Sequence, residues 1–279
     1  MTTTLAPPPL DRLSLELTGR CQLACSHCYA NSGPTGGHGS MTAADWAGVV
    51  DAASELGARL VSMIGGEPTL HPALPELVGR ALDAGMTAEI FTNLIRIPDG
   101  LWPTLMRPGA RMSTSYYATD PAEHDRITGR RGSHALTHAN IVEVLRRRIP
   151  LRVNIVGEGA AADRAHAELL ALGVPTITRD PVRGFGRAAG GESVAAGGCG
   201  RCGLGRAAVL PDGRVIPCVM NRALDGGSVL TASLGELLSG ERWQEAVNAV
   251  PRPRMPYMAC GPDDDTKPCG PVHPEPDPN

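Results

Sequence analysis

Short apolar runs alternate with segments of helical apolar spacing along the first 180 residues of the chain. Leu13–Leu17 alternates apolar and polar positions and predicts a strand. A helix is expected after Thr42, which can cap it with Asp45 three residues on, and Gly57 is expected to end it. Five further strands are expected at Arg59–Ile64, Met86–Thr92, Met112–Tyr117, Leu151–Val156 and Val174–Thr178. Further helices are expected at Leu74–Leu82, Gly100–Met106, His134–Arg148 and Ala161–Leu172.

Six strand–helix alternations imply an α/β fold of parallel strands joined by right-handed crossovers. The count falls short of the eight repeats of a closed barrel. In the expected helix His134–Arg148, the apolar face is predicted to carry Ile141, Val142 and Leu145. Residues 1–180 are therefore expected to form one core domain.

The remaining residues predict a smaller second unit. Residues 181–198 are rich in Gly, Ala and Arg and lack periodicity, which is typical of a linker. Within residues 199–279, the runs Ala207–Leu210 and Val215–Ile216 flank Gly213 and predict a β-hairpin. A helix capped by Ser233 is expected to continue to Val250, before a Pro-rich tail.

Composition excludes several classes of protein. Of the 279 residues, 42% are hydrophobic and 3% aromatic, so the core must consist of Leu, Val, Ala and Ile. The net charge of −3 gives no broad nucleic-acid footprint. No signal peptide is visible, and no apolar run approaches the roughly 20 residues of a membrane helix. The eight Cys are thus expected in a reducing, cytoplasmic compartment, where clustered thiols indicate metal binding or catalysis.

Three thiols, Cys21, Cys25 and Cys28, follow the first expected strand at the spacing C-x3-C-x2-C. Soft ligands in one loop can hold an iron–sulfur cluster or zinc. A structural zinc site, which needs four ligands, and unligated thiols are the alternatives. Three thiols on a four-iron cluster would leave one iron open to a substrate or cofactor.

This loop resembles that of the radical S-adenosylmethionine (SAM) enzymes, with His27 in the place of the usual aromatic residue. The resemblance covers about the first 180 residues and implies an open partial (β/α)6 barrel. It also implies that the open iron of a 4Fe–4S cluster chelates the amine and carboxylate of SAM. An electron from an external donor then cleaves SAM, and the resulting 5′-deoxyadenosyl radical removes a hydrogen atom from the substrate.

Further candidates lie where expected strands end, because ligands in such sheets gather at carboxyl ends. Gly65, Gly66, Glu67 and Pro68 match the family's SAM-amine motif, with Glu67 holding the ammonium. By the same resemblance Asn93, Ser115 and Asn154 touch the ribose or methionyl carboxylate of SAM. Each set has a plainer interpretation, as a turn before a helix or as strand-end groups bonded to backbone. Residues 120–133 resemble the loop after strand four of peptide-modifying members, or form a charged surface loop.

A second Cys group lies in the C-terminal unit, at Cys199, Cys202, Cys218, Cys260 and Cys269. The hairpin is expected to fold Cys218 back toward Cys202. A zinc ribbon is one interpretation. The resemblance to SPASM and twitch extensions implies instead one auxiliary 4Fe–4S cluster. We favour Cys199, Cys202, Cys218 and Cys260 as its ligands, with Cys269 replacing Cys260 or staying unligated.

Family members with this layout mostly modify ribosomal peptides by crosslinking, epimerisation or oxidation. A peptide substrate is therefore the first expectation, and a separate leader-binding protein is expected if the peptide does not dock directly. A dehydrogenase or epimerase of a small antibiotic or sugar intermediate is the alternative. A non-catalytic metal-binding scaffold is the alternative of another class. Nucleic-acid and membrane partners are not expected, and no catalytic side chain beyond the cluster ligands is assigned.

Overall fold

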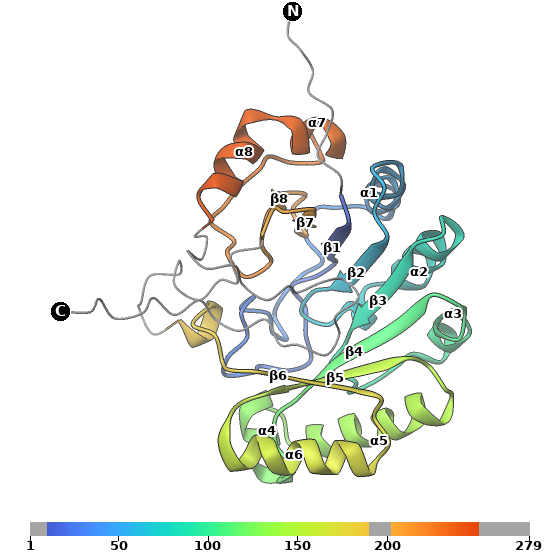
Figure 1. Cartoon of the computed structure of the whole chain (residues 1–279), viewed down its shortest axis with the longest axis vertical. Coiled ribbons are helices and arrows are strands. Elements are labelled where there is room, and N and C mark those ends of the chain that lie inside the picture. Colours follow the sequence, from blue (N-terminus) through green and yellow to red (C-terminus); the bar gives the residue numbers. More distant parts are fainter. Residues whose placement is uncertain (1–9, 190–201, 251–279) are drawn as a thin grey trace, which may run out of the picture.

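A curved eight-stranded sheet forms the centre of the protein (Figure 1). The computed structural model describes residues 10–189 and 202–250. Within these residues the strand order is β6-β5-β4-β3-β2-β1-β7-β8. All neighbours are parallel except β7 and β8, which form an antiparallel hairpin. The strands are β1 (Arg12–Glu16), β2 (Leu60–Ile64), β3 (Thr87–Phe91), β4 (Ala110–Tyr116), β5 (Leu151–Val156), β6 (Thr176–Asp180), β7 (Arg206–Val209) and β8 (Val215–Ile216).

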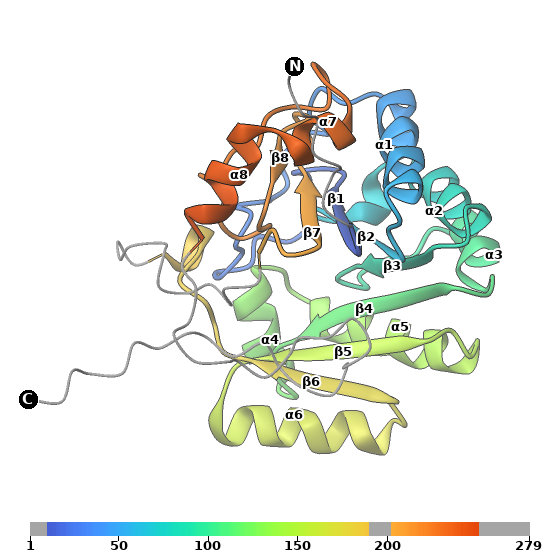
Figure 2. The same ribbon diagram turned by 45° about the horizontal axis from the view of Figure 1, so that its top comes forward.

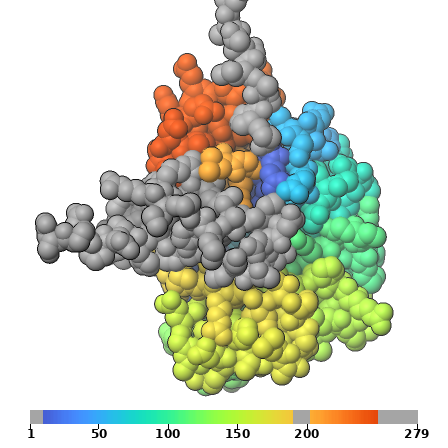
Figure 3. Space-filling model, viewed as in Figure 1, coloured from blue at the N-terminus to red at the C-terminus, as the bar shows by residue number. Residues whose placement is uncertain are grey.

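Helices cover the outer, convex side of the sheet (Figure 2). The α-helices are α1 (Ala43–Glu55), α2 (Leu74–Asp83), α3 (Trp102–Leu105), α4 (Pro121–Thr128), α5 (Ser133–Arg146), α6 (Gly159–Ala171), α7 (Leu234–Ser239) and α8 (Glu241–Asn248). Short 3-10 helices are η1 (Pro68–Leu70), η2 (Asp99–Leu101) and η3 (Gly186–Ala188). The space-filling view places α7 and α8 at one end of the molecule and β6 and α6 at the other (Figure 3). In the described part of the chain, no helix combines the length and apolar character needed to cross a membrane.

The parallel α/β fold predicted from the alternating pattern is confirmed, and so is the open (β/α)6 arrangement that the family resemblance implies. Six parallel strands, β1 to β6, follow one another in spatial order as they do in the sequence. The cap of α1 is also confirmed, since the Thr42 hydroxyl accepts from the Asp45 N–H at 3.2 Å and the Asp45 carboxylate accepts from the Thr42 N–H at 2.8 Å. Strands and helices therefore begin close to where local pattern and capping chemistry indicate.

The two faces of the sheet differ in polarity because successive side chains point to opposite faces. The outer face packs against the helices and forms the core, with Leu13, Met63, Ile90 and Val153 among its fully buried residues. The inner face carries polar and charged side chains at the intervening positions. These are Arg12, Ser14, Glu16, Ser62, Thr87, Glu89, Arg111, Ser113, Ser115, Arg152, Asn154, Thr176, Thr178 and Asp180.

Helix α4 was not predicted, and residues 120–133 are not a loop. Asp120 caps this helix by accepting from the backbone N–H groups of residues 122 and 123, and Gly129 ends it with a φ of 67°. The helix has few apolar residues, and its buried side chains are His124 and Thr128. A hydrophobic pattern could not reveal a helix whose buried face is polar.

Two further helix predictions need correction. On α5, Val142 is 44% exposed, and the buried face runs through His134, Thr137, Ile141 and Val144. The helix expected from Ser233 to Val250 is two helices, because the backbone at Gly240 is extended (ψ 159°). The Ser233 cap itself is confirmed, since its hydroxyl accepts from the Glu236 N–H at 3.3 Å.

The predicted hairpin is confirmed and extends the core sheet. Strand β7 pairs in parallel with β1, so that Leu13 lies opposite Ala207 and Leu15 opposite Val209. Gly213 lies in the connection with a φ of 84°, which favours glycine. The sequence did not indicate this parallel pairing, which joins residues 206–216 to the strand that leads into the three-Cys loop.

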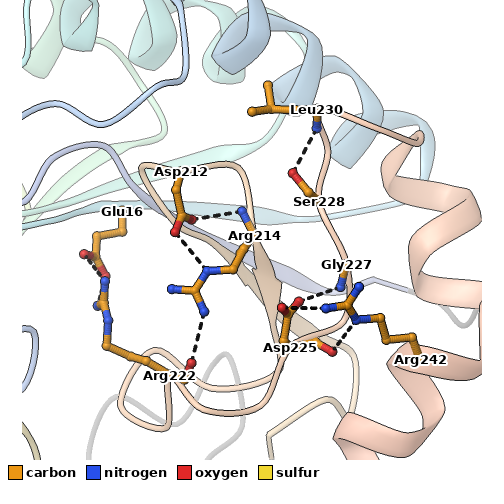
Figure 4. A network of polar contacts seen from close by, with 9 residues as sticks. All are labelled: Glu16, Asp212, Arg214, Arg222, Asp225, Gly227, Ser228, Leu230 and Arg242. Carbon is orange, nitrogen blue, oxygen red and sulfur yellow. Dashed lines mark hydrogen bonds and ion pairs between the residues drawn. The ribbon is translucent and has the colours of Figure 1, made fainter.

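A buried ion pair ties the segment after β8 to the inner face of β1 (Figure 4). Glu16 is 1% exposed, and both of its carboxylate oxygens accept from the Arg222 guanidinium, at 2.5 and 2.8 Å. Burial raises the pKa of Glu16, and Arg222 opposes this shift. The Arg214–Asp212 pair beside it is largely exposed.

We predict that Arg222→Leu lowers the free energy of unfolding by about 3–5 kcal/mol at pH 8, because it leaves the Glu16 carboxylate buried without its cation. The folded pKa of Glu16 is raised, so the folded state favours the protonated form. The deficit should therefore shrink as the pH falls toward 5 and Glu16 takes up a proton. Urea unfolding at both pH values measures it. Arg80→Leu, which breaks the exposed Arg80–Asp51 pair, is the control and should cost less than about 1 kcal/mol; equal losses in the two variants would contradict the assignment.

Candidate active site

The three-Cys loop lies at the carboxyl end of β1, where the parallel strands of such sheets place their ligands. It closes on itself through backbone hydrogen bonds. The Cys21 N–H donates to the Gly33 carbonyl at 3.0 Å, and the Cys28 N–H donates to the Cys25 carbonyl at 3.3 Å. All three predicted ligands are therefore held by one loop of defined conformation.

Helix α4 supports this loop through its C-terminal carbonyl groups. The Ala24 N–H donates to the Thr128 carbonyl and the Ser26 N–H to the Ile127 carbonyl, both at 2.9 Å. The last carbonyls of a helix have no partner within the helix and can accept from a neighbouring segment. Gly129 lets the chains approach, since a Cβ there would lie 3.1 Å from the Ala24 carbonyl oxygen. The helix that the sequence failed to predict thus positions the Cys25 side of the loop.

Residues 185–188 hold the loop from a second side. The Arg187 guanidinium donates to the carbonyls of Cys25 at 2.6 Å and Ser32 at 2.8 Å, and the Arg187 N–H donates to the Cys28 carbonyl at 3.0 Å. A Cβ at Gly186 would come within 2.3 Å of that Cys28 carbonyl oxygen. This part of the expected linker is therefore packed structure, and Phe185 beside it is buried.

Burial controls the protonation of two of the thiols. It raises the pKa of Cys21 to about 12 and that of Cys25 to about 11, while a hydrogen bond with Tyr117 lowers the Cys25 value in part. The Asn93 amide donates to Cys21 Sγ at 3.6 Å. Cys21, Cys25 and Cys28 are in no disulfide. The raised pKa values keep Cys21 and Cys25 protonated at neutral pH until a metal displaces the proton, so that loading of the loop must release protons.

The Gly65–Pro68 segment packs against the entrance of the same loop. The Gly66 N–H donates to the Thr18 carbonyl at 2.6 Å, and the Glu67 N–H donates to the Arg20 carbonyl at 2.8 Å. A Cβ at Gly66 would lie 2.4 Å from the Arg20 carbonyl oxygen. The two glycines therefore let this segment lie close to the backbone that leads into the Cys loop. Pro68 begins η1 directly after Glu67.

Glu67 is fully buried and joins the ends of β2 and β3. Its carboxylate accepts from the Thr69 N–H at 3.1 Å, the Thr69 hydroxyl at 2.7 Å and the Asn93 N–H at 2.8 Å. Burial raises its pKa, and these donors oppose the shift. A carboxylate offers about four acceptor sites, and the Thr92 side chain also bonds to Glu67, so four donors from the protein already occupy those sites. The role of Glu67 toward an ammonium stays a prediction.

The other predicted cofactor residues fall into two groups. Asn93 and His27 lie at the Cys loop, whereas Ser115 and Asn154 lie on β4 and β5. Asn93 contacts Cys21 and accepts from Gln22 Nε2 at 3.3 Å, and the His27 ring packs edge-on against Tyr117 with centroids 5.0 Å apart. Ser115 is hydrogen-bonded to Tyr117. Asn154 lies opposite Ser115 in the sheet and accepts from the Thr178 hydroxyl at 2.8 Å.

The second Cys group is described in part. The Gly203 N–H donates to the Pro217 carbonyl at 3.2 Å, so the hairpin brings the chain at Cys218 back beside Cys202, as predicted. Cys199, Cys260 and Cys269 lie outside the described residues. Across residues 10–189 and 202–250, no three His, Cys, Asp or Glu side chains converge on a position for a single metal ion.

The chemistry of the first donor set fits an iron–sulfur cluster. Three thiols on one loop provide soft ligands, and Asn93 supplies a hydrogen-bond donor to one sulfur, a contact that tunes cluster potentials. The His27 Nε2 is buried without a partner among the described residues, so the loop also has an unused polar atom.

The sequence did not identify Arg187, Gln22 or Tyr117 as site residues. Arg187 lies in a segment without periodicity, and its function depends on backbone carbonyls that no spacing rule reports. Tyr117 follows β4 directly, so its position at a strand end was the signal that could have found it.

The chain matches the sequence model of the Radical SAM superfamily over residues 15–159. It is 35% identical over 162 residues to a PqqA peptide cyclase of Xanthomonas oryzae pv. oryzae, an alignment that covers 58% of this chain and 43% of the cyclase. The chain thus matches about two fifths of the length of that curated relative.

Two solved structures share the fold at 14% sequence identity. One is Streptococcus suis SuiB bound to the precursor peptide SuiA, with a TM-score of 0.73 over 88% of this chain and 68% of SuiB. The other is BtrN in complex with AdoMet and 2-DOIA, with a TM-score of 0.55 over 86% of this chain and 87% of BtrN.

We predict that Gly66→Ala costs about 1–3 kcal/mol of unfolding free energy and reduces iron loading, because its Cβ would push the Gly65–Pro68 segment away from Arg20. Urea unfolding and iron analysis after anaerobic reconstitution measure both effects. Gly48→Ala is the control. A Cβ there meets nothing within 4 Å in the exposed middle of α1, and the change should stabilise the protein by up to about 1 kcal/mol. Normal iron content in Gly66→Ala would show that the packing against Arg20 is not needed for the loop.

Proposed function

Because the chain belongs to the radical SAM superfamily, with its match over residues 15–159, we propose that Cys21, Cys25 and Cys28 bind the 4Fe–4S cluster that this family implies. The observation that carries the assignment is that all three thiols lie in one loop at the carboxyl end of β1, held by α4, Arg187 and the Gly65–Pro68 segment. A fourth iron without a protein ligand remains available to SAM.

Bound together, the cluster and SAM supply one-electron cleavage of the sulfonium and a radical that removes a hydrogen atom from the substrate. The side chains around them bind and orient. Asn93 donates to the Cys21 sulfur, and Glu67 fixes Asn93 by accepting its N–H. Gly65, Gly66 and Pro68 set the backbone where the SAM amine is expected. His27, Ser115 and Asn154 are the proposed contacts to the rest of SAM.

A ribosomally made peptide is the proposed substrate, modified by crosslinking, epimerisation or oxidation. Two likenesses support it. The sequence relative is named a PqqA peptide cyclase, and the SuiB structure holds a precursor peptide. Residues 120–133, which resemble a segment of peptide-modifying members, form α4 and its end, and this helix contacts the Cys loop directly. An external electron donor and a separate leader-binding protein are the proposed partners.

A small-molecule substrate is the second candidate. The fold likeness to BtrN, whose structure holds AdoMet and 2-DOIA, supports it at a TM-score of 0.55.

An auxiliary 4Fe–4S cluster in the C-terminal unit is also proposed, with Cys199, Cys202, Cys218 and Cys260 as ligands and Cys269 as the substitute for Cys260. The adjacent backbone of Cys202 and Cys218 supports it. We propose a division into residues 1–180, 181–198 and 199–279, in which residues 185–188 pack against the Cys loop and β7 pairs with β1.

We predict that exchanging Cys21, Cys25 and Cys28 for Ala removes about four irons per chain and abolishes formation of 5′-deoxyadenosine from SAM under reducing, anaerobic conditions. Iron analysis and chromatography of the products measure the two losses. Ser26→Ala, an exposed position in the same loop, is the control and should keep both properties. A triple variant with its full iron content, or a colourless zinc protein as the unchanged form, would refute the cluster and favour a metal-binding scaffold.

We further predict that the reconstituted protein changes the mass of a peptide made alongside it in its own cell. Crosslinking or oxidation removes two hydrogen atoms, and epimerisation in deuterated water adds one deuterium. Tandem mass spectrometry locates the change, and the triple Cys variant is the blank. Cleavage of SAM with no peptide altered, together with turnover of a sugar or antibiotic intermediate, would favour the small-molecule candidate.

A further inference from the structure

A group of arginines lies on the inner face of the sheet, toward the amino ends of the strands. Arg12 comes from β1, Arg111 from β4 and Arg152 from β5, and they surround a single carboxylate, Glu89 on β3. Arg152 Nη2 lies 3.0 Å and Arg111 Nε 3.3 Å from Glu89 Oε1. Among these four side chains, three cations face one anion.

The internal pairing leaves polar atoms unused. Glu89 is 1% exposed, and its Oε2 accepts no hydrogen bond from residues 10–189 or 202–250. The Nε groups of Arg12 and Arg152 are also buried and donate to no group in the same part of the chain. Burial and the neighbouring arginines lower the pKa of Arg12, while Glu89 opposes that shift. A purely structural ion network would be expected to satisfy such atoms, because unpaired buried donors are costly.

An aromatic ring stands between this cluster and the Cys loop. Phe91 lies on the same inner face and is 36% exposed. The chain has only two Phe residues, and one of them is thus left partly exposed to solvent. The Arg152 guanidinium carbon lies 5.3 Å from its ring centroid. Phe91 is two residues from Asn93, about 7 Å along an extended chain, and Glu89 is about as far again. An occupant of the arginine cluster would therefore extend past Phe91 toward Cys21.

We propose that Arg12 and Arg152 form a carboxylate-binding subsite on the inner face of the sheet, with Phe91 as its apolar wall and Glu89 as the group that orients the guanidiniums. This inference rests on the proposed function and names a feature of its substrate, a carboxylate placed a fixed distance from the reacting C–H bond. Planar guanidinium groups match carboxylates well. The nearby Glu89 disfavours a dianion such as phosphate more than a single carboxylate. The carboxylate belongs to an Asp or Glu side chain or to a peptide C-terminus.

The test uses the full chain, reconstituted anaerobically. Isothermal titration calorimetry measures its affinity for three short peptide probes. These are acetyl-Gly-Glu-Gly-amide, acetyl-Gly-Gln-Gly-amide and acetyl-Gly-Gly-Gly with a free C-terminus. We expect the Glu peptide to bind roughly tenfold or more tightly than the Gln peptide, since a charge-assisted hydrogen bond is lost in the latter. Tight binding of the free-acid peptide instead would assign the site to a C-terminal carboxylate.

Arg152→Gln should reduce the preference for Glu over Gln to roughly twofold or less. The matched control is Arg179→Gln, which removes an arginine of β6 that pairs with Asp163 and not with the cluster. If Arg152→Gln does not fold, Arg12→Gln replaces it. The affinities of the unchanged chain for the Glu and Gln peptides test the subsite in either case. Equal binding of all three probes, or no binding at about 10 mM, overturns the subsite.

The outcome is separable from the proposed function. A protein that forms 5′-deoxyadenosine but shows no carboxylate preference loses the subsite alone. A protein that prefers the Glu peptide but does not cleave SAM keeps the subsite and loses the proposed reaction.

Discussion

The site depends on how the backbone of one short loop is satisfied. A loop that presents three thiols cannot pair its own N–H and C=O groups as a helix or strand does, yet buried backbone groups need partners. Here the partners come from three distant segments: the carbonyls at the end of α4, the guanidinium of Arg187, and the backbone N–H groups of Gly66 and Glu67. Each segment is anchored to a different part of the sheet, so the loop conformation is a property of the whole fold.

The sheet separates stability from chemistry. Its outer face is a largely apolar core under the helices, and the burial of this apolar surface stabilises the fold. Its inner face carries the buried charges, among them Glu16 with Arg222 and Glu89 with its arginines. Desolvation offsets much of the attraction within such a buried pair, although removing one partner is costly because the other charge stays buried. This difference between the two faces follows from the alternation of side chains along each strand. The side chains of the inner face can therefore change without altering the apolar core.

The sequence predicted those parts of the protein whose determinants are local. The alternation of strands and helices, the Thr42 and Ser233 caps and the hairpin at Gly213 each follow from periodicity, from a turn glycine or from one side chain bonding a nearby N–H. The sequence could not predict α4, because its buried residues are His124 and Thr128 and it lacks an apolar stripe. Nor could it predict the contacts of Arg187 or the pairing of β7 with β1, since both join segments more than 150 residues apart, for which a single sequence carries no signal.

The β1–β7 pairing also bears on how the chain can be divided. An open sheet presents unpaired N–H and C=O groups along its outermost strand, and these can recruit a strand from another molecule. In this protein β7 covers that side of β1, and the two-residue β8 ends the series with very little backbone left to pair. A fragment that stopped at the end of β6 would uncover β1 next to the three-Cys loop. The β7–β8 hairpin therefore shields the strand that leads into this loop from pairing with another molecule.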